Sequence, residues 1–350
     1  MIVLSVFVVL AVLGVMLCLL YDPKQRLAPG RQCEVTTPDP EKYQNDCVHP
    51  CIRRLQDGRY VMVQSPWPAA QDGVENPILY FSKDPATWHD GVVLKDTPAT
   101  GYNSDPNVFE EDGRIYVFWR EVDTPRCQKY GKSRMVMGGI VGDDGKMTEE
   151  KVYITADADS TDHTICPTLI KHNGKYYFYT LWRRRKSFLR NLGITIWKGT
   201  SLENPDFKLI DKVKVNNPLV WDRFFENKFF GRLFFIPVIK RYDLWHFDLF
   251  EHDGRLYMVS SDEMDDFVML SESRDWKHFT TVKTPLLNNN YSDKIVGHRQ
   301  RFYKPTAQVV DNQLYLWYTY TDGWPYKNKL FLSTIGVEEL LKISFLCRQQ

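Results

Sequence analysis

The chain has 350 residues, of which 14% are aromatic, and it carries a formal net charge of +1. This length is ample for one large hydrophobic core. The 45 basic and 44 acidic residues nearly balance, so the chain lacks the basic excess of a typical nucleic-acid-binding protein, and we expect no nucleic acid among its partners.

The first twenty residues are predicted to form a membrane anchor. Residues 2–20 are apolar apart from Ser5, Gly14 and Cys18. As a helix rising about 1.5 Å per residue, this stretch is long enough for the roughly 30 Å hydrocarbon layer. It lacks the basic start and the small-residue cleavage site of a signal peptide. We therefore predict a single transmembrane helix over residues 1–20 that contacts the lipid bilayer through residues 2–20.

Two signals disagree on which side of the membrane the rest of the chain lies. Lys24, Arg26 and Arg31 follow the anchor, and the positive-inside rule would then keep the domain in the cytoplasm. An even number of cysteines outside the anchor is instead compatible with disulfides of an exported domain. These cysteines are Cys33, Cys47, Cys51, Cys127, Cys166 and Cys347. We expect the exported side, with six free thiols in a cytosolic fold as the alternative.

After a polar, proline-containing linker over residues 21–45, one pattern recurs five times. Each copy has a start residue, usually before proline, then an apolar run, a Gly or Asn turn and an aromatic strand. Asp-Gly and Asn-Gly between apolar runs are strong hairpin signals. The start residues are His49, Asp105, Cys166, His246 and Lys304, and consecutive ones are separated by 56 to 80 positions. Five such units predict an all-β, five-bladed β-propeller over residues 46–350, with one helix from Val337 to Leu346.

The start residues are the candidates for a functional site, because the innermost strands of a propeller line its central channel. We expect all five to meet at one mouth of that channel. Asp and His before proline also open ordinary turns, so each alone has a structural explanation. Aromatic and polar side chains adjoin them and suit a sugar ring, whose C–H face is apolar and whose rim is hydroxylated. These neighbours are Tyr102, Asn103, Arg120, Glu121, Trp245, Asp248 and Tyr303.

Residues 46–340 resemble the five-bladed propeller superfamily of glycoside hydrolases, which includes families 43, 32, 62, 68 and 117. The stretch from Asp105 to Phe109, followed by Gly113 to Tyr116, carries this resemblance. A closer likeness is to propeller proteins of bacteria and their phages, through a longer set of motifs. These are His49-Pro50, Ser65-Pro66-Trp67-Pro68, Glu75-Asn76-Pro77, Tyr102 to Pro106, Trp119-Arg120-Glu121 and Trp245 to Asp248.

The resemblance implies a carbohydrate partner and a glycosidase, yet the chain departs from the family pattern. His49 stands where inverting members have the catalytic base on blade one, and no Ser-Glu-Gly acid is present. We therefore expect Asp105 as base or pKa-setting carboxylate, with His49 or His246 as proton partners. The candidates for the acid are Glu121, Asp248 and Glu226.

The remaining expectations concern ligands. The predicted substrate-binding residues are Trp67, Tyr102, Asn103, Arg120, Trp245, Tyr303 and Lys304. Arg120 and Lys304 favour an acidic sugar. No cofactor or metal is expected, because Cys47 and Cys51 lack a second ligand pair and the His and Lys start residues disfavour a channel Ca²⁺. The alternatives are a non-catalytic glycan-binding or polysaccharide-assembly propeller and a glycosyl-transferring enzyme, for which no Gly-rich phosphate loop is present.

Overall fold

The structure is a computed structural model that describes residues 9, 12–13, 25–142, 145–156, 161–184, 193–223, 237–242, 244–262, 267–289, 301–322 and 327–346. Among these residues, none of the helices has the length and apolar character needed to cross a membrane. Nearly all of the predicted anchor lies outside the described residues, so the anchor stays a prediction.

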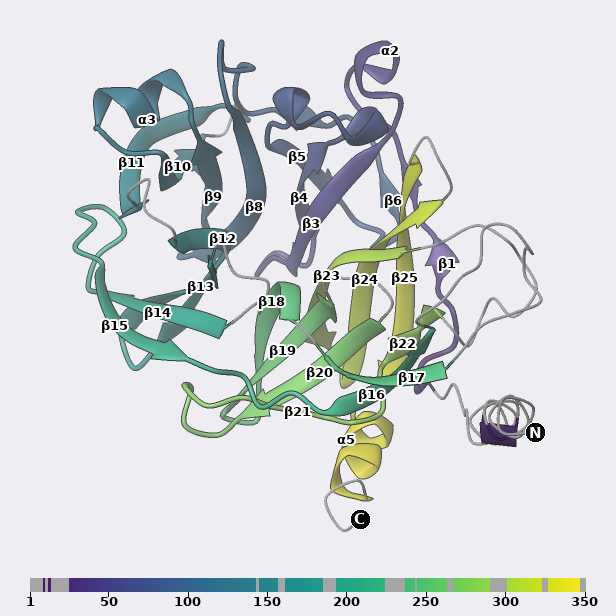
Figure 1. Ribbon diagram of the computed structural model, residues 1–350. Coiled ribbons are helices and arrows are strands. Elements are labelled where there is room, and N and C mark those ends of the chain that lie inside the picture. Colours follow the sequence, from purple (N-terminus) through teal and green to yellow (C-terminus); the bar gives the residue numbers. More distant parts are fainter. Residues whose placement is uncertain are drawn as a thin grey trace.

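Five sheets stand around a common axis as the blades of a propeller (Figure 1). Blade one contains β3 (Cys47–Arg54), β4 (Tyr60–Pro66), β5 (Ile78–Ser82) and β7 (Val92–Val93). Blade two contains β8 (Tyr102–Glu111), β9 (Arg114–Val122), β10 (Arg134–Val141) and β11 (Met147–Ala156). Blade three contains β12 (Thr161–His172), β13 (Lys175–Arg184), β14 (Gly193–Gly199) and β15 (Lys208–Val213).

The last two blades complete the ring. Blade four contains β18 (Leu244–His252), β19 (Arg255–Asp262), β20 (Phe267–Ser273) and β21 (Thr280–Thr281), with β22 (Leu287–Asn288) also paired to β20. Blade five contains β23 (Arg301–Val310), β24 (Gln313–Asp322), β25 (Lys327–Gly336) and β1 (Arg31–Gln32). The expected all-β fold of five blades is confirmed.

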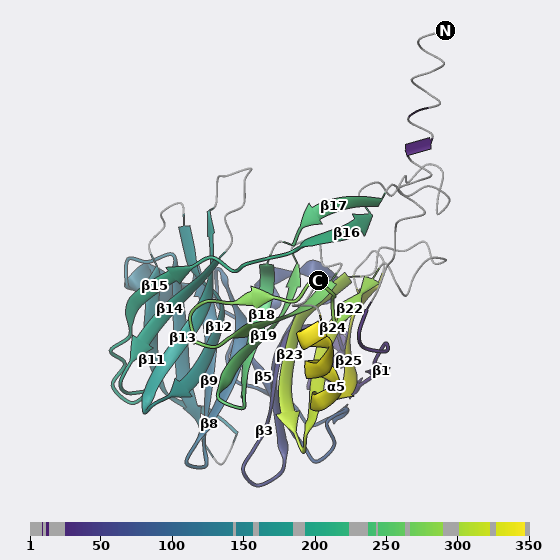
Figure 2. The same ribbon diagram turned by 90° about the horizontal axis from the view of Figure 1, so that it is seen from below.

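Short elements outside the blades connect or decorate them. The hairpin of β16 (Leu219–Arg223) and β17 (Pro237–Arg241) projects from one end of the ring, as the side view shows (Figure 2). A parallel pair joins β2 (Glu34–Val35) to β6 (Thr87–Trp88). The helices are α2 (Pro40–Tyr43), α3 (Pro125–Lys129), the predicted α5 (Val337–Leu346) and the 3-10 turns η1 (Pro68–Ala70) and η2 (Asp72–Val74).

Local sequence explains why each unit forms. The hairpins between the first and second strands of blades two, three and four turn at Asp112-Gly113, Asn173-Gly174 and Asp253-Gly254, where both residues have positive φ. Two-residue turns of this kind need that conformation. Five clusters of apolar side chains lie between the sheets, one at each junction of neighbouring blades. Burial of these side chains holds the ring together.

The amino-terminal segment closes the ring. Arg31 and Gln32 of β1 pair with Leu332 and Phe331 at the outer edge of blade five. Leu27 is buried in the cluster between blades four and five. Residues 21–45 were expected to form only a linker, yet they contain β1, β2 and α2. A strand of two residues is too short to show an alternating hydrophobic pattern, so the sequence could not predict it. β1 forms because the free edge of β25 offers it hydrogen bonds.

The five described cysteines outside the anchor are free thiols and all are buried, so the disulfides that favoured export are not formed among them. Burial raises the pKa of Cys33 to about 12. A thiol of this kind is inert, since the thiolate is the reactive form. The side of the membrane remains an untested prediction.

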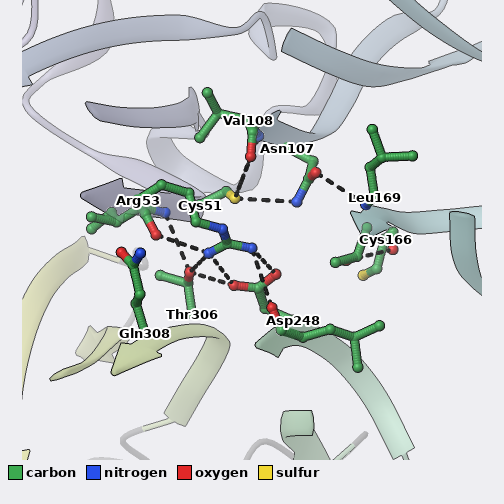
Figure 3. Close-up of polar contacts among 12 residues, drawn as sticks. Cys51, Arg53, Asn107, Val108, Cys166, Leu169, Asp248, Thr306 and Gln308 are labelled. Atoms are coloured by element: carbon green, nitrogen blue, oxygen red, sulfur yellow. Dashed lines mark hydrogen bonds and ion pairs between the residues drawn. The ribbon is translucent and has the colours of Figure 1, made fainter. Parts of the chain in front are cut away.

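A buried polar network fills part of the channel between the innermost strands (Figure 3). Arg53 of β3 donates two hydrogen bonds of 2.8 Å to the carboxylate of Asp248 on β18. Thr306 of β23 donates to the same carboxylate at 2.5 Å. Burial opposes ionisation of Asp248, but the Arg53 guanidinium overcomes it and holds the pKa of that carboxyl below its usual range. Blades one, four and five are thereby tied together.

Asn107 makes the corresponding links among the first three blades. Its amide nitrogen donates to Cys51 Sγ at 3.1 Å, and its amide oxygen accepts from the Leu169 backbone at 3.3 Å (Figure 3). Blade five is joined to the start of blade one by Asn328, whose side chain donates to Asp46 at 2.6 Å. Burial raises the pKa of Asp46 to about 6, although the Asn328 hydrogen bonds oppose the shift.

We predict that Arg53→Met lowers the free energy of unfolding by about 3–5 kcal/mol, because the Asp248 charge is left buried without its partner. Urea unfolding of the purified protein measures this loss. The double variant Arg53→Met/Asp248→Leu should recover most of the stability, since it removes both charges. A single variant within about 1 kcal/mol of the wild type would contradict this role for the pair.

We predict that the free energy of unfolding depends on pH through Asp46. Its raised pKa means that the folded state binds the proton more tightly than the unfolded state. The resulting stabilisation is full below about pH 4 and is lost as pH rises through about 6. Urea unfolding between pH 4 and 7 should therefore show a steeper fall in stability in the wild type than in Asp46→Asn, because the variant keeps the other titrating groups. Equal slopes in the two proteins would refute the assignment.

Candidate active site

The innermost strand of every blade contains an irregularity near its start. The pairing register with the second strand shifts there in all five blades, between Val48 and Cys51, Ser104 and Asn107, Ile165 and Thr168, Leu244 and Phe247, and Phe302 and Pro305. The five predicted start residues lie inside these intervals. His49, Asp105 and Cys166 have positive φ values of 58, 50 and 52°. Bulges re-aim side chains, and such strained conformations gather at functional sites.

Asp105 on β8 is the point at which side chains from several blades meet. Its Oδ1 lies 3.5 Å from His49 Nε2 and 3.8 Å from His246 Nε2. Cys166 Sγ donates to the same oxygen at 3.6 Å, and Arg120 lies 3.8 Å from Oδ2. The Asp105 residue is only 2% exposed. Blades one, two, three and four therefore each contribute a group to this carboxylate.

The groups around Asp105 have shifted pKa values. Burial, together with the nearby Lys304 and Arg120 cations, holds the pKa of His49 well below its usual range. Burial and His49 do the same for His246, although Asp105 opposes the shift. Glu75 Oε2 lies 3.3 Å from His49 Nδ1, and burial and the Asp105 charge raise the pKa of Glu75 well above its usual range. These shifts favour the neutral form of both imidazoles and of the Glu75 carboxyl.

A cavity of about 320 Å³ opens beside these groups. It combines aromatic rings, carboxyl groups, two histidines and two arginines, which is the mixture that positions a polar ligand with an apolar face. Its lining residues are His49, Trp67, Asp72, Glu75, Tyr102, Ser104, Asp105, Arg120, Arg134, Ile165, Trp245, His246 and Tyr303.

Aromatic rings form one wall of the cavity. Trp67 and Tyr303 are stacked with their centroids 5.5 Å apart. The Tyr303 ring lies 4.5 Å from His246, and the Trp245 ring lies 4.9 Å from the same histidine. Trp67 is oriented by a hydrogen bond of 2.8 Å from its Nε1 to Asp72. An exposed ring face in such a wall can pack against the C–H face of a sugar.

Eight of the twelve residues predicted for the site line the cavity, and four do not. Lys304 is fully buried and donates to the Pro106 carbonyl at 3.1 Å. Asn103 is buried with its side-chain amide 2.7 Å from that of Asn76. The eight lining residues are His49, Trp67, Tyr102, Asp105, Arg120, Trp245, His246 and Tyr303.

The predicted acids lie elsewhere. Asp248 belongs to the network with Arg53 (Figure 3). Glu121 accepts hydrogen bonds from Thr124 and Trp119, and thereby ties the end of β9 to the start of α3. Glu226 lies outside the described residues. The geometry gives Glu121 and Asp248 structural partners rather than a place in the cavity wall.

Glu75 and Asp72 are two carboxyl groups of the cavity that the site prediction omitted, and Glu75 is the one in contact with His49. It lies in the connection between η2 and β5, so no strand pattern pointed to it. The Glu75-Asn76-Pro77 motif was the available signal. Arg134 was also missed, although it stands on the same face of the sheet as Arg120, two residue pairs further along the β9–β10 ladder.

Comparisons with known proteins agree on the fold. Neither a protein-family model nor a curated protein sequence matches this chain. An N-acetylgalactosamine deacetylase from F. plautii, solved with blood group B trisaccharide, matches with a TM-score of 0.66 and 13% identity, covering 91% of this chain and 97% of its own. An α-L-arabinanase from Cellvibrio cellulosa, solved with arabinohexaose, matches with a TM-score of 0.54 and 12% identity, covering 85% and 98%.

A third match is an α-L-arabinofuranosidase from Lactobacillus brevis, with a TM-score of 0.54, 12% identity and coverage of 82% and 90%. Family-43 glycoside hydrolases are also among the structures with this fold. The five-bladed propeller fold, which the motifs implied, is therefore confirmed for this chain. At 11–13% identity the likeness concerns the fold alone.

We predict that Trp67→Ala weakens glycan binding roughly fivefold, because one stacked ring contributes about 1 kcal/mol beyond its buried area. A glycan array selects the ligand, and titration calorimetry then measures its dissociation constant with each variant. Tyr130→Ala, which removes an aromatic ring that is 54% exposed and does not line this cavity, is the control. Equal affinities for the two variants would exclude the aromatic wall as a sugar platform.

Proposed function

We propose that the chain is a hydrolase that acts on a glycan in this cavity, with Asp105 at the reaction centre. The observation that carries the proposal is the convergence of His49, His246, Arg120 and Cys166 on one buried carboxylate beside an aromatic wall. Buried titratable groups with shifted pKa values that line a cleft are typical of catalytic sites.

Hydrolysis of a glycosidic bond is the first form of the proposal. It requires a protonated acid for the leaving oxygen and an ionised carboxylate that activates water. Burial and the Asp105 charge raise the pKa of Glu75 in the cavity wall, which favours its protonated form, so it takes the role of the acid. Asp105 takes the role of the base. Family-43 glycosidases and arabinan-degrading enzymes share the fold, which supports this reading.

Removal of an acyl group from an amino sugar is the second form. The deacetylase with the TM-score of 0.66 acts on N-acetylgalactosamine and has the same fold over 91% of this chain. The observation in this chain that favours it is the pair of histidines beside Asp105, because His49 stands where inverting glycosidases have the carboxylate base. In this reaction water adds to the amide carbon, and the C–N bond breaks to give acetate and a free amine.

Arg120 and Arg134 in the cavity wall favour a substrate with an anionic group, such as a uronate or a sulfated sugar. An anchored protein with this activity would act on glycans near a membrane surface, which is how the predicted anchor and the proposed activity fit together. A propeller that only binds glycans is the alternative, and product analysis separates the two.

The test is incubation of the protein with polysaccharides and acetylated oligosaccharides, followed by mass spectrometry. New reducing ends would indicate a glycosidase, and loss of an acetyl group would indicate a deacetylase. Asp105→Asn should reduce either rate by about 10²–10⁴-fold. Asp211→Asn, which changes a carboxylate outside the cavity wall, should leave the rate unchanged. Glycan binding without any product would favour the binding protein, and full activity of Asp105→Asn would refute the proposed centre.

A further inference from the structure

Two histidines in the site have buried ring nitrogens that lack hydrogen-bond partners. Among the described residues, His49 Nδ1, His49 Nε2 and His246 Nδ1 are buried without such a partner. His49 and His246 are 5% and 2% exposed. An unsatisfied buried polar atom costs about 1–3 kcal/mol, so several in one place require an explanation.

The distances from the two histidine Nε2 atoms to Asp105 Oδ1 are longer than ordinary hydrogen bonds and match the separation of two ligands on one metal ion. His49 Nε2 and His246 Nε2 lie 3.5 and 3.8 Å from Asp105 Oδ1, beyond the roughly 2.7–3.2 Å of an ordinary hydrogen bond. Ligands about 2.0–2.2 Å from a tetrahedral ion lie roughly 3.4 Å from each other. One ligand atom from each of the three residues lies within 4.8 Å of the others. The three groups therefore surround a position that one ion would fill.

The chemistry of the three groups selects a class of ion. Two imidazoles and one carboxylate oxygen suit Zn²⁺ and similar first-row transition metals, whereas Ca²⁺ and Mg²⁺ prefer oxygen ligands. An imidazole binds such a metal through one ring nitrogen, and the Nε2 atoms of both histidines face the same Asp105 oxygen. Three protein ligands leave a fourth position open for water, as in catalytic zinc sites.

The surroundings support such a site. Glu75 Oε2 lies 3.3 Å from His49 Nδ1, so its carboxyl group is placed to accept the Nδ1–H when Nε2 binds the ion. Arg120 lies at Asp105 Oδ2, so Oδ1, which also accepts a hydrogen bond of 3.6 Å from the Cys166 thiol, is the oxygen that faces the proposed ion. The Lys304 and Arg120 charges oppose a cation at this position, whereas the Asp105 charge favours one.

We propose that His49, Asp105 and His246 bind one divalent transition-metal ion, with Zn²⁺ as the expected metal and Glu75 as the residue that orients His49. The proposal departs from the expectation, drawn from the sequence, that the site holds no metal. The inference deepens the proposed hydrolase function, on which the catalytic use of the ion rests: the ion would activate the attacking water. Metal binding itself is independent of that function.

The experiment measures binding separately from activity. Protein stripped with a chelator is titrated with Zn²⁺ by calorimetry, and bound metal is counted by elemental mass spectrometry. We expect one tight equivalent per chain, an increase in Tm on binding, and loss of both in His246→Ala. Glu75→Gln should keep the stoichiometry and weaken affinity about 10–100-fold. His278→Ala, which removes an exposed histidine of blade four, is the matched control and should bind like the wild type.

Co²⁺ substitution distinguishes this site from the thiols of the chain. Histidine and carboxylate ligands give visible d–d bands without the strong near-ultraviolet absorption of a thiolate–metal bond. Absence of tight binding in the wild type, or equal binding by folded His246→Ala, would overturn the inference. Full hydrolysis by metal-free protein would reject the catalytic use of the ion and leave the hydrolase proposal intact. A bound ion without hydrolysis of any glycan tested would instead count against the hydrolase proposal.

Discussion

Closure of the ring is the constraint on which the site depends. The groups at Asp105 are contributed by residues as distant in sequence as His49 and His246, and they meet because the innermost strands stand around one axis. The Arg53–Asp248 pair, Thr306 and Asn107 link those strands by buried hydrogen bonds. β1 completes the last blade from the other end of the chain. Without closure, Asp105 would face water with partners from its own blade only.

The closed ring also supports local strain. His49, Asp105 and Cys166 hold positive φ values within bulges, a conformation that costs roughly 1–3 kcal/mol for a residue other than glycine. Packing at five blade junctions holds these positions in place. The bulge is present in every blade, so the repeat unit itself aims a side chain at the axis. The three strained residues, one in each of blades one, two and three, therefore lie where the proposed chemistry takes place.

The sequence predicted the fold well because its strongest signals were local. Turns such as Asp112-Gly113 and Asn173-Gly174 have a conformational requirement that can be read from two residues, and their repetition gave the number of blades. The strand starts His49, Asp105 and His246 followed from the same repeat. β1 escaped prediction because its two residues become a strand only through the edge of β25.

The acids were harder to predict because neighbours in sequence can face different surroundings. His246 lines the cavity, whereas Asp248, two residues later, pairs with Arg53 from another blade. Arg120 lines the cavity, whereas the carboxylate of the next residue, Glu121, accepts a hydrogen bond from Thr124 at the start of α3. Glu75 reaches the cavity from a connection without periodicity. Only contacts between blades, which no local pattern contains, decide these roles.

The central claim is that side chains from blades one, two and four converge on Asp105 around a position suited to a metal ion. Anomalous diffraction from crystals soaked in Mn²⁺ or Zn²⁺ salts tests it most directly. The account predicts one strong anomalous peak bounded by His49, Asp105 and His246. Electron density that places the two histidine rings away from the Asp105 carboxylate, with no peak between them, would contradict it.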